Sequence, residues 1–435
     1  MQEGKISKIG FLLIALLYVF SMLNIRFGKD HFKHTVLSDA RGYYAYLPAW
    51  VVYDDLQFEF QSRVDPVYWP EDQHVNYRIF VNGGFSNKYF AGVGLSALPF
   101  YALAHAYVKA TNGVADGFSK PYVLSISLAS CFYALLGLFC CTLFMSMHGV
   151  RYFHQWLAIA VLAFGTQLFY YTISEAGMSH AYSFGWFSIF LLMFSYWLKG
   201  GKEGHFFMAA FALGMVVLIR PVNILPVLFF LPFILLFNGI KLSEFFQSLL
   251  KQRIKILPAA ILLMIPLMVQ FWCYYKTLGQ IWVDGYAGET FDFLHPHLWD
   301  ILFSFRKGLF IYTPLCLLIV PALLYWFKQK KMNLVFSWLL GMLLTTWLFS
   351  SWWSWYYGGS FGLRAYIEFY PLFILPFALV LNHFSKKLRT ALTVSSLLLI
   401  LFCQLQTWQY RHNIIHWDNM DFKSWVALYY PRLRI

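Results

Sequence analysis

Charged side chains are scarce in this sequence. Asp, Glu, Lys and Arg make up 12% of its 435 residues, whereas apolar residues make up 60% and aromatic residues 21%, with a mean hydropathy of +0.56. This composition excludes a soluble globular protein and predicts a membrane protein. The net charge of +13 fits that prediction, because basic residues collect in the cytoplasmic loops of membrane proteins. We therefore expect membrane lipid as a partner and no nucleic acid.

The motifs of soluble cofactor chemistry are missing. The sequence has no GxGxxG, no Walker loop, no Ser-His-Asp signature and no CxxC. All six cysteines lie inside apolar runs, so no disulfide framework is expected. His295 and His297 lack a third ligand at a recognised spacing and predict a structural role. The sequence therefore predicts no particular cofactor, and the binding of a divalent metal is left as an open alternative.

Long apolar runs dominate the chain instead. A helix that spans the hydrocarbon core needs about 20 apolar residues. The runs that meet or approach this length are 9–25, 122–145, 156–172, 178–198, 206–219, 224–237, 256–274, 309–327, 334–349, 366–381 and 388–405. Arg220 and Pro221 interrupt the runs 206–219 and 224–237, which predict two tilted spans or a helical hairpin. The sequence thus predicts an all-α polytopic membrane protein with about eleven transmembrane helices.

The basic residues orient these helices. Lys and Arg cluster near 5–8, 199–202, 251–255, 328–331 and 386–389. These clusters share one side only if the apolar segment 89–108 does not cross, so we predict that this segment is a juxtamembrane helix at the outer interface. The N-terminus is then cytoplasmic and the C-terminus outside.

The polar parts of the chain gather on the outer side in this topology. They are a large loop over 26–121, a second loop over 275–307 and a tail over 406–435. The apolar runs leave few residues for a separate soluble domain, so 1–435 is expected to be a single transmembrane domain. Functional residues are therefore expected on the outer face.

The first outer loop contains a candidate acid. The sequence "TVLSDARGYYAYLPAWVVYDD" predicts a helix with Ser38 as N-cap and Asp39 in the first turn, where the helix dipole favours an ionised carboxylate. Asp39 is either a functional acid or only a helix-start residue, and Asp54 and Asp55 at the end of the same helix are a less favoured acid site. The helix face expected to lie on lipid headgroups carries Tyr43, Leu47 and Trp50.

A second acid on the outer side is Glu175 in "YYTISEAGMSHAYSF". A carboxylate at a membrane boundary is costly enough to need a reason. Ser179 and His180 are placed to share its site. The alternative is a helix-start acid capped by Ser174.

Several cations stand at the outer ends of apolar runs. Arg220 lies between two such runs, where its five donors suit a phosphate, and the alternative is a structural pair with a buried carboxylate. Arg306, Lys307 and Arg364 are placed similarly, although such residues often only extend to the interface. Several cations on one face above an apolar bundle suit an anionic headgroup on a long hydrocarbon tail.

Aromatic residues are concentrated in "WLFSSWWSWYYGGSFGLR". An interfacial aromatic belt explains one or two such rings. The density here, followed by Gly358, Gly359 and Gly362, favours a tight re-entrant loop whose rings stack on sugar or isoprenoid.

These motifs together resemble a known family. In chain order, "SDxxxYY", "KYFAGVGLSALPFYAL", "SEAGMSHAYSF", "IRPVNILP", "RKGLFIYTP" and "WYYGGSFGLRAY" are similar to bacterial GT-C glycosyltransferases of the protein-mannosyltransferase and aminoarabinose-transferase type. The resemblance covers nearly the whole chain. It implies a GT-C-like bundle in the bacterial plasma (inner) membrane with juxtamembrane helices on the outer face.

The resemblance also implies an activity. Such enzymes transfer a sugar from a polyprenyl-phosphate carrier to a hydroxyl group of a lipid, glycan or protein, with inversion, at the outer (periplasmic) face. Asp39 would be the general base, and Glu175 would orient the acceptor or the sugar. The donor phosphate would be bound by Arg220, Arg364, Arg306 and Lys88. The sugar and lipid would contact Tyr43, Tyr44, His180, Trp352, Trp355, Tyr356 and Tyr357.

One difference from the family concerns metal binding. Many relatives carry two adjacent acids in the first-loop helix, whereas here Ala40 follows Asp39. This difference puts metal dependence in doubt.

The rival function is a non-catalytic transporter or flippase of lipid-linked glycans. A flippase is expected to place charges along a path through the membrane, whereas the charges here gather on one face beside a large loop. A scaffold that only binds lipid-linked glycan would tolerate loss of Asp39. The charge distribution therefore favours the enzyme.

Overall fold

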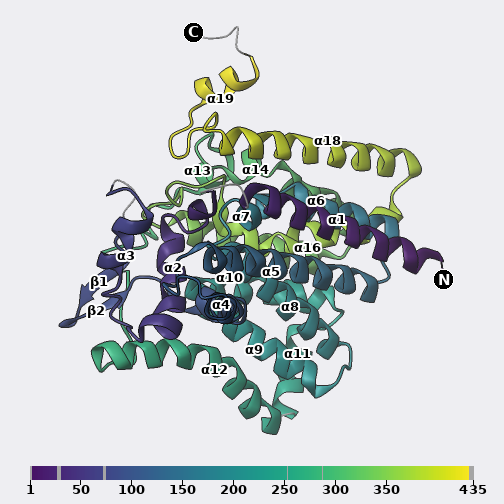
Figure 1. The fold of residues 1–435 in the computed structure, drawn as a ribbon. Coiled ribbons are helices and arrows are strands. Elements are labelled where there is room, and N and C mark those ends of the chain that lie inside the picture. The colour runs from purple at the N-terminus through teal and green to yellow at the C-terminus, as the bar shows by residue number, and fades with distance from the viewer. Residues whose placement is uncertain (1, 27–30, 72–74, 252, 287, 431–435) are drawn as a thin grey trace.

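The computed structural model describes residues 2–26, 31–71, 75–251, 253–286 and 288–430 (Figure 1). Helices make up most of the described chain, and one antiparallel hairpin joins β1 (Arg78–Val81) to β2 (Gly84–Asn87). The prediction of an all-α polytopic membrane protein is confirmed. The expected outer loop 26–121 and tail 406–435 extend over positions outside the described residues, namely 27–30, 72–74 and 431–435.

Five helices of the described chain are long and apolar enough to cross a bilayer. These are α5 (Lys120–Met147), α8 (His180–Leu198), α12 (Arg253–Leu278), α16 (Met332–Ser350) and α18 (Lys386–Arg411). Few residues in the apolar stretches of α12 and α18 are buried inside the protein, whereas most residues in those of α5 and α8 are buried. The first pair therefore lies at the periphery of the bundle and the second pair in its core.

The other apolar runs form helices whose apolar stretches are too short to meet this criterion. These are α1 (Gln2–Arg26), α6 (Tyr152–Phe164), α9 (Glu203–Ile219), α10 (Ile224–Phe237), α15 (Ile319–Lys328) and α17 (Pro371–Val380). The chain bends by 96° between α10 and α11 (Leu242–Lys251). Each apolar run expected from the sequence contains a helix, but some runs are broken: 156–172 is divided between α6 and α7 (Leu168–Ile173), and 309–327 begins with α14 (Leu309–Tyr312) and a 3-10 turn (Pro314–Leu318) before α15. The number of full crossings stays a prediction.

The break at Arg220 separates α9 from α10. Arg220 has an extended backbone and Pro221 opens a short 3-10 turn, because proline cannot continue the hydrogen bonding of the preceding helix. Before the break, α9 packs against α8 and α12. After the break, α10 packs mainly against α16. The two helices therefore have different main packing partners, and whether they are two spans or a hairpin stays a prediction.

The segment after the first loop forms α4 (Gly92–Ala110). Figure 1 looks nearly along α4, whereas α5, α16 and α18 run across the same view. Although α4 has 19 residues, it is not among the helices apolar enough to span. This orientation agrees with a helix that lies across the bundle, and its place at the outer interface stays a prediction.

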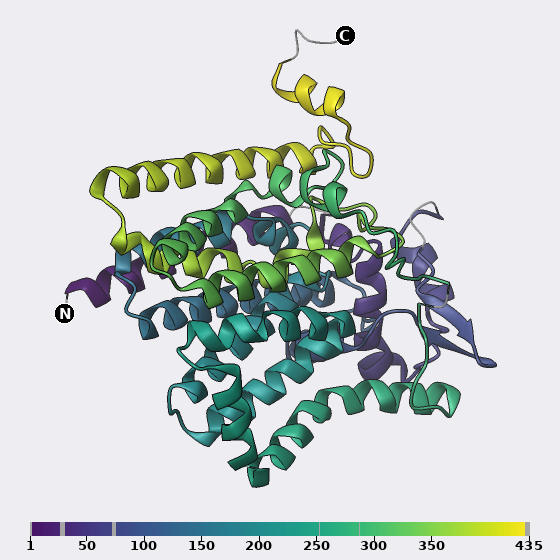
Figure 2. The same ribbon diagram turned by 180° about the vertical axis from the view of Figure 1, so that it is seen from behind.

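The outer loop packs on one end of the bundle. It contributes α2 (Asp39–Pro48), α3 (Gln61–Tyr68) and the hairpin, which lie together in Figures 1 and 2. The helix α2 begins at Asp39 as predicted, but the Ser38 side chain makes no capping hydrogen bond. The expected lipid-facing side of α2 is wrong, because Leu47 is fully buried in an aromatic core between α2, α4 and α5.

Candidate active site

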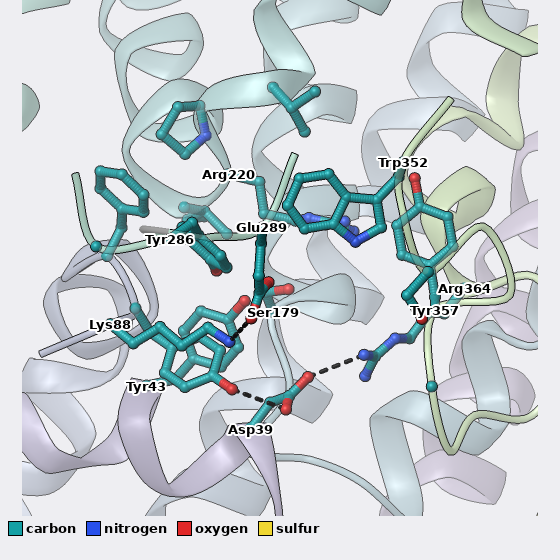
Figure 3. Close-up of a pocket in the computed structure, with 18 of the residues that line it drawn as sticks. Asp39, Tyr43, Lys88, Ser179, Arg220, Tyr286, Glu289, Trp352, Tyr357 and Arg364 are labelled. Carbon is teal, nitrogen blue, oxygen red and sulfur yellow. Dashed lines mark hydrogen bonds and ion pairs between the residues drawn. The ribbon is translucent and has the colours of Figure 1, made fainter. Parts of the chain in front are cut away.

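A cavity of about 580 Å³ opens where α2, the start of α8, the α9–α10 break and two loops meet. The loops are 282–291 and the aromatic turn, by which we mean residues 352–364 after α16. Figure 3 shows the charged residues directed into this space from different elements. The charged and histidine residues that line it are Asp39, Lys88, His180, Arg220, Asp284, Glu289 and Arg364.

Asp39 lies at the centre of this charge cluster. Its Oδ2 is 2.9 Å from Nη2 of Arg364, and the hydroxyl of Tyr89 donates to Oδ1 at 2.8 Å. Burial alone would raise the pKa of Asp39, but the charge of Arg364 and the two hydrogen bonds hold the pKa below its ordinary value. Asp39 is therefore ionised in the first turn of α2, where the helix dipole also favours an anion.

Lys88 follows β2 and faces the same cavity. Its Nζ pairs with Oε1 of Glu289 and lies 5.2 Å from the ring centre of Tyr286. The side chains of Lys88 and Glu289 are each partly exposed. The ammonium group can therefore exchange its carboxylate partner for an incoming anion.

Arg220 shows both of the arrangements that the sequence left open. It lines the cavity, and its Nη1 is also 3.1 Å from Oε1 of Glu368. The same carboxylate oxygen lies 3.5 Å from Nδ1 of His180. Glu368 is fully buried in the 3-10 turn Arg364–Phe369 and does not line the cavity. Arg220 is thus held by a carboxylate behind the cavity wall while part of its guanidinium faces the cavity.

The sequence analysis missed Glu368. An available signal was its position inside the apolar run 366–381, because a carboxylate in a membrane segment needs a partner. The partner, Arg220, lies 148 positions away in the chain. Only the folded chain brings the two together.

The aromatic turn contributes one wall of the cavity. Trp352, Tyr356 and Tyr357 line it as expected. Trp355 does not, because its ring stacks on His297 with 5.5 Å between centroids. The turn has no regular helix, so no helical periodicity in the sequence could predict which of these rings face the cavity.

Other expected contacts fall outside the cavity lining. Tyr43 faces the cavity, but Tyr44 points to the other side of α2 and donates to the carbonyl of Gly117. Glu175 accepts a hydrogen bond from Tyr170 at 2.8 Å and does not line the cavity. Burial raises the pKa of Glu175, against the hydrogen bond from Tyr170 and the charge of Arg364.

Arg306 also requires correction as a cavity residue. Its guanidinium pairs with both oxygens of Asp418, at 3.1 and 3.2 Å, and it does not line the cavity. Asp418 belongs to the C-terminal tail, so the charge of Arg306 is used to hold the tail. At the other end of α2, Asp55 accepts backbone N–H groups of Gln57 and Glu59, a local role.

In the described part of the chain, no three His, Cys, Asp or Glu side chains converge in a group that would hold a metal ion. His295 and His297 each pair with a nearby aspartate, Asp292 and Asp300, at 3.0 Å.

No protein-family model and no curated protein matches this sequence. Among solved structures, the crystal structure of ArnT from Cupriavidus metallidurans bound to undecaprenyl phosphate matches 94% of this chain, with a TM-score of 0.51 and 14% sequence identity. The two chains therefore share an overall fold. The present chain spans 66% of the length of ArnT.

Proposed function

We propose that the protein is a membrane glycosyltransferase that moves a sugar from a polyprenyl-phosphate donor to an acceptor hydroxyl. The observation that carries this proposal is the single cavity in which Asp39 faces three cations, Lys88, Arg220 and Arg364, beside apolar and aromatic walls. The fold likeness supports it, because ArnT was crystallised with undecaprenyl phosphate. The acceptor is a hydroxyl group of a lipid, glycan or protein.

The cations would bind the donor phosphate. Arg364 and Arg220 each keep guanidinium N–H groups near the cavity, and planar guanidinium groups bind phosphate oxygens in pairs. Lys88 adds a mobile point charge. The sugar and the first isoprene units would lie against Trp352, Tyr357 and neighbouring rings, where aromatic faces bind apolar sugar faces.

Asp39 would act as the general base. When the anionic phosphate enters, it competes for Arg364, and Asp39 becomes free to accept a proton. The acceptor oxygen then attacks the anomeric carbon, its proton passes to Oδ of Asp39, and the carbon–oxygen bond to phosphate breaks with the electron pair leaving on phosphate. Attack opposite the leaving group inverts the configuration, and the cations stabilise the departing charge.

Glu175 would position rather than react. It lies behind the cavity wall and feels the charges of both Arg364 and Asp39. A second carboxylate there would keep Arg364 oriented while its contact with Asp39 is exchanged for phosphate. The reaction would occur at the outer face of the bacterial plasma membrane, with the N-terminus cytoplasmic and the C-terminus outside.

Asp39→Asn tests the proposal against transport. The amide keeps the shape of the side chain but accepts no proton, so transfer of labelled sugar from polyprenyl phosphate in membranes should fall by about 10²- to 10⁴-fold. Binding of undecaprenyl phosphate should persist. A flippase or scaffold that needs no base would retain its lipid-linked glycan handling in this variant.

The matched control is Asp54→Asn. Asp54 is exposed and has a left-handed backbone (φ 47°) after α2, a conformation that asparagine also adopts readily. Its transfer rate should stay near the parental rate. Parental transfer by Asp39→Asn would refute the base assignment.

A further inference from the structure

The C-terminal tail returns from α18 to the back of the aromatic turn. Between α18 and α19 (Phe422–Tyr429), Trp417 contacts the turn and Lys307, and Asp418 pairs with Arg306. We infer that Arg306, Lys307, Trp417 and Asp418 form a tail latch that holds the aromatic turn, and with it the donor side of the cavity, in position. This inference rests on the proposed function.

Lys307 is the buried centre of the tail latch. It is 1% exposed, and its Nζ donates to the carbonyl oxygens of Trp417, at 2.6 Å, and Ser360. The backbone N–H of Ser360 donates to the same Trp417 carbonyl at 3.2 Å. One ammonium group therefore joins a tail residue to a residue of the aromatic turn.

The burial of Lys307 needs a structural reason. Burial lowers the pKa of Lys307 to about 7, against the opposing charge of Asp418, which shows that a charged amine is costly there. Its hydrogen bonds to two carbonyl oxygens offset that cost. These two hydrogen bonds join the tail to the aromatic turn, and this connection is the structural reason that we assign to the buried Lys307.

Arg306 supplies the second half of the tail latch. Its two contacts to the Asp418 carboxylate are joined by a third, from Nε to the Asp418 carbonyl at 3.3 Å. The guanidinium also lies 3.3 Å from the ring centre of Tyr356, which lines the cavity. Arg306 therefore supports a cavity wall from behind.

The tail also fits tightly against the turn. A Cβ added at Gly359 would lie 2.8 Å from Cε3 of Trp417, so a side chain there would displace the indole ring. The glycine allows the close approach of Trp417. The contact is thus an intimate one between two segments far apart in the sequence.

A short path leads from the tail latch to the proposed phosphate site. The hydroxyl of Ser360 and the backbone N–H of Arg364 both donate to the carbonyl of Gly362 at 3.1 Å. Arg364 in turn pairs with Asp39. Displacement of the turn at Ser360 should therefore displace Arg364 and weaken its contact with an anion.

The test is a charge reversal across the Arg306–Asp418 pair in the full-length protein. Arg306→Asp and Asp418→Arg are made singly and together. The probe is undecaprenyl phosphate, and both the Kd and the number of binding sites are measured. Each single variant should raise the Kd about ten-fold, and the double variant should restore most of the affinity because the opposite charges again face each other.

A second measurement, the rate of thiol labelling, needs no lipid. Ser354→Cys is a small change at a position of the turn that is 7% exposed and lines the cavity, so its labelling reports on movement of this cavity wall, and all six native cysteines are buried. In the single charge-reversal backgrounds a maleimide should label this thiol faster, and in the double variant the labelling should slow again. The matched control is Glu203→Arg, which reverses an ion pair with Lys255 between α9 and α12, and should change neither measurement.

The outcomes separate the possible failures. Fewer binding sites with an unchanged Kd would mean that the pair only stabilises the fold, which overturns the inference. An unchanged Kd with faster labelling would also overturn it, because the turn would move without affecting the site. If the parental protein does not bind undecaprenyl phosphate, the proposed function is wrong, and unchanged labelling in the single variants would then overturn the tail latch itself.

Discussion

Two arginine–carboxylate pairs flank the cavity, and they differ in what can reach their carboxylates. Arg364 pairs with Asp39, whose side chain is 28% exposed, whereas Arg220 pairs with Glu368, whose side chain is 0% exposed. The two arginines themselves are equally exposed, at 15%. The contrast therefore lies in the acids.

In the proposed reaction, this contrast separates the acid that would accept a proton, Asp39, from the acid that would only hold a cation, Glu368. An acceptor hydroxyl can approach Asp39 through the cavity, whereas Glu368 is fully buried and its Oε1 lies 3.1–3.5 Å from polar atoms of Arg220, His180 and Asn223. We therefore expect the buried Glu368 carboxylate to fix the position of Arg220 and not to transfer a proton. The proposed roles of the two acids therefore follow from the exposure of their side chains, because both acids pair with an arginine.

The largest expected effect beyond loss of the base is the removal of Glu368. Glu368→Ala leaves Arg220 without its buried counter-charge, which should cost about 3–5 kcal/mol of folding free energy. Thermal unfolding in detergent measures this change. The Arg220→Leu, Glu368→Leu double variant should regain most of the stability, and a parental melting temperature for Glu368→Ala would contradict the structural role.

Next in size are the arginines themselves. Arg364→Ala and Arg220→Ala each remove a charge-assisted contact to phosphate worth about 1.5–3 kcal/mol, or about 10- to 100-fold in Kd for undecaprenyl phosphate. Arg364→Lys should recover only part of the affinity, because lysine lacks the planar fork. Parental affinity in both alanine variants would remove phosphate binding from the proposal.

A smaller effect concerns pH. In the free enzyme the pKa of Asp39 is held low by Arg364 and hydrogen bonds, so the acid limb of kcat/KM should lie below the ordinary aspartate pKa of about 3.9. Arg364→Ala removes the main opposing charge and leaves burial, so the limb should move to higher pH. A limb that stays in place or moves to lower pH would show that another group titrates.

The smallest effect distinguishes two rings of the aromatic turn. Trp352 lines the cavity, whereas Trp355 stacks on His297 outside it. Trp352→Leu should weaken donor binding by about 0.5–1.5 kcal/mol. The matched variant Trp355→Leu should bind the donor like the parent, and equal losses in both would mean that the rings act on the turn and not on the donor.

Local sequence was sufficient for much of the fold. Apolar runs predicted where helices occur, whereas the prediction from charge distribution that α4 does not cross the membrane stays a prediction. The start of α2 at Asp39 was also predictable, because the helix start depends on neighbouring residues. The failure of Ser38 as a side-chain cap and the burial of Leu47 were not, because both depend on how the outer loop packs.

The sequence by itself determined the class of the protein, since composition and apolar run lengths carry that information. It also identified part of the charged lining of the cavity, namely Asp39, Lys88, Arg220 and Arg364, but not Asp284 or Glu289. Only the tertiary structure decided which cation meets which acid. Arg364 and Asp39 are 325 positions apart, and Arg306 and Asp418 are 112 apart. The physical reason is that an ion pair depends on distance in space, and helix packing sets that distance. The same packing directs Asp39 into the cavity and places Arg306 beside Asp418 of the C-terminal tail.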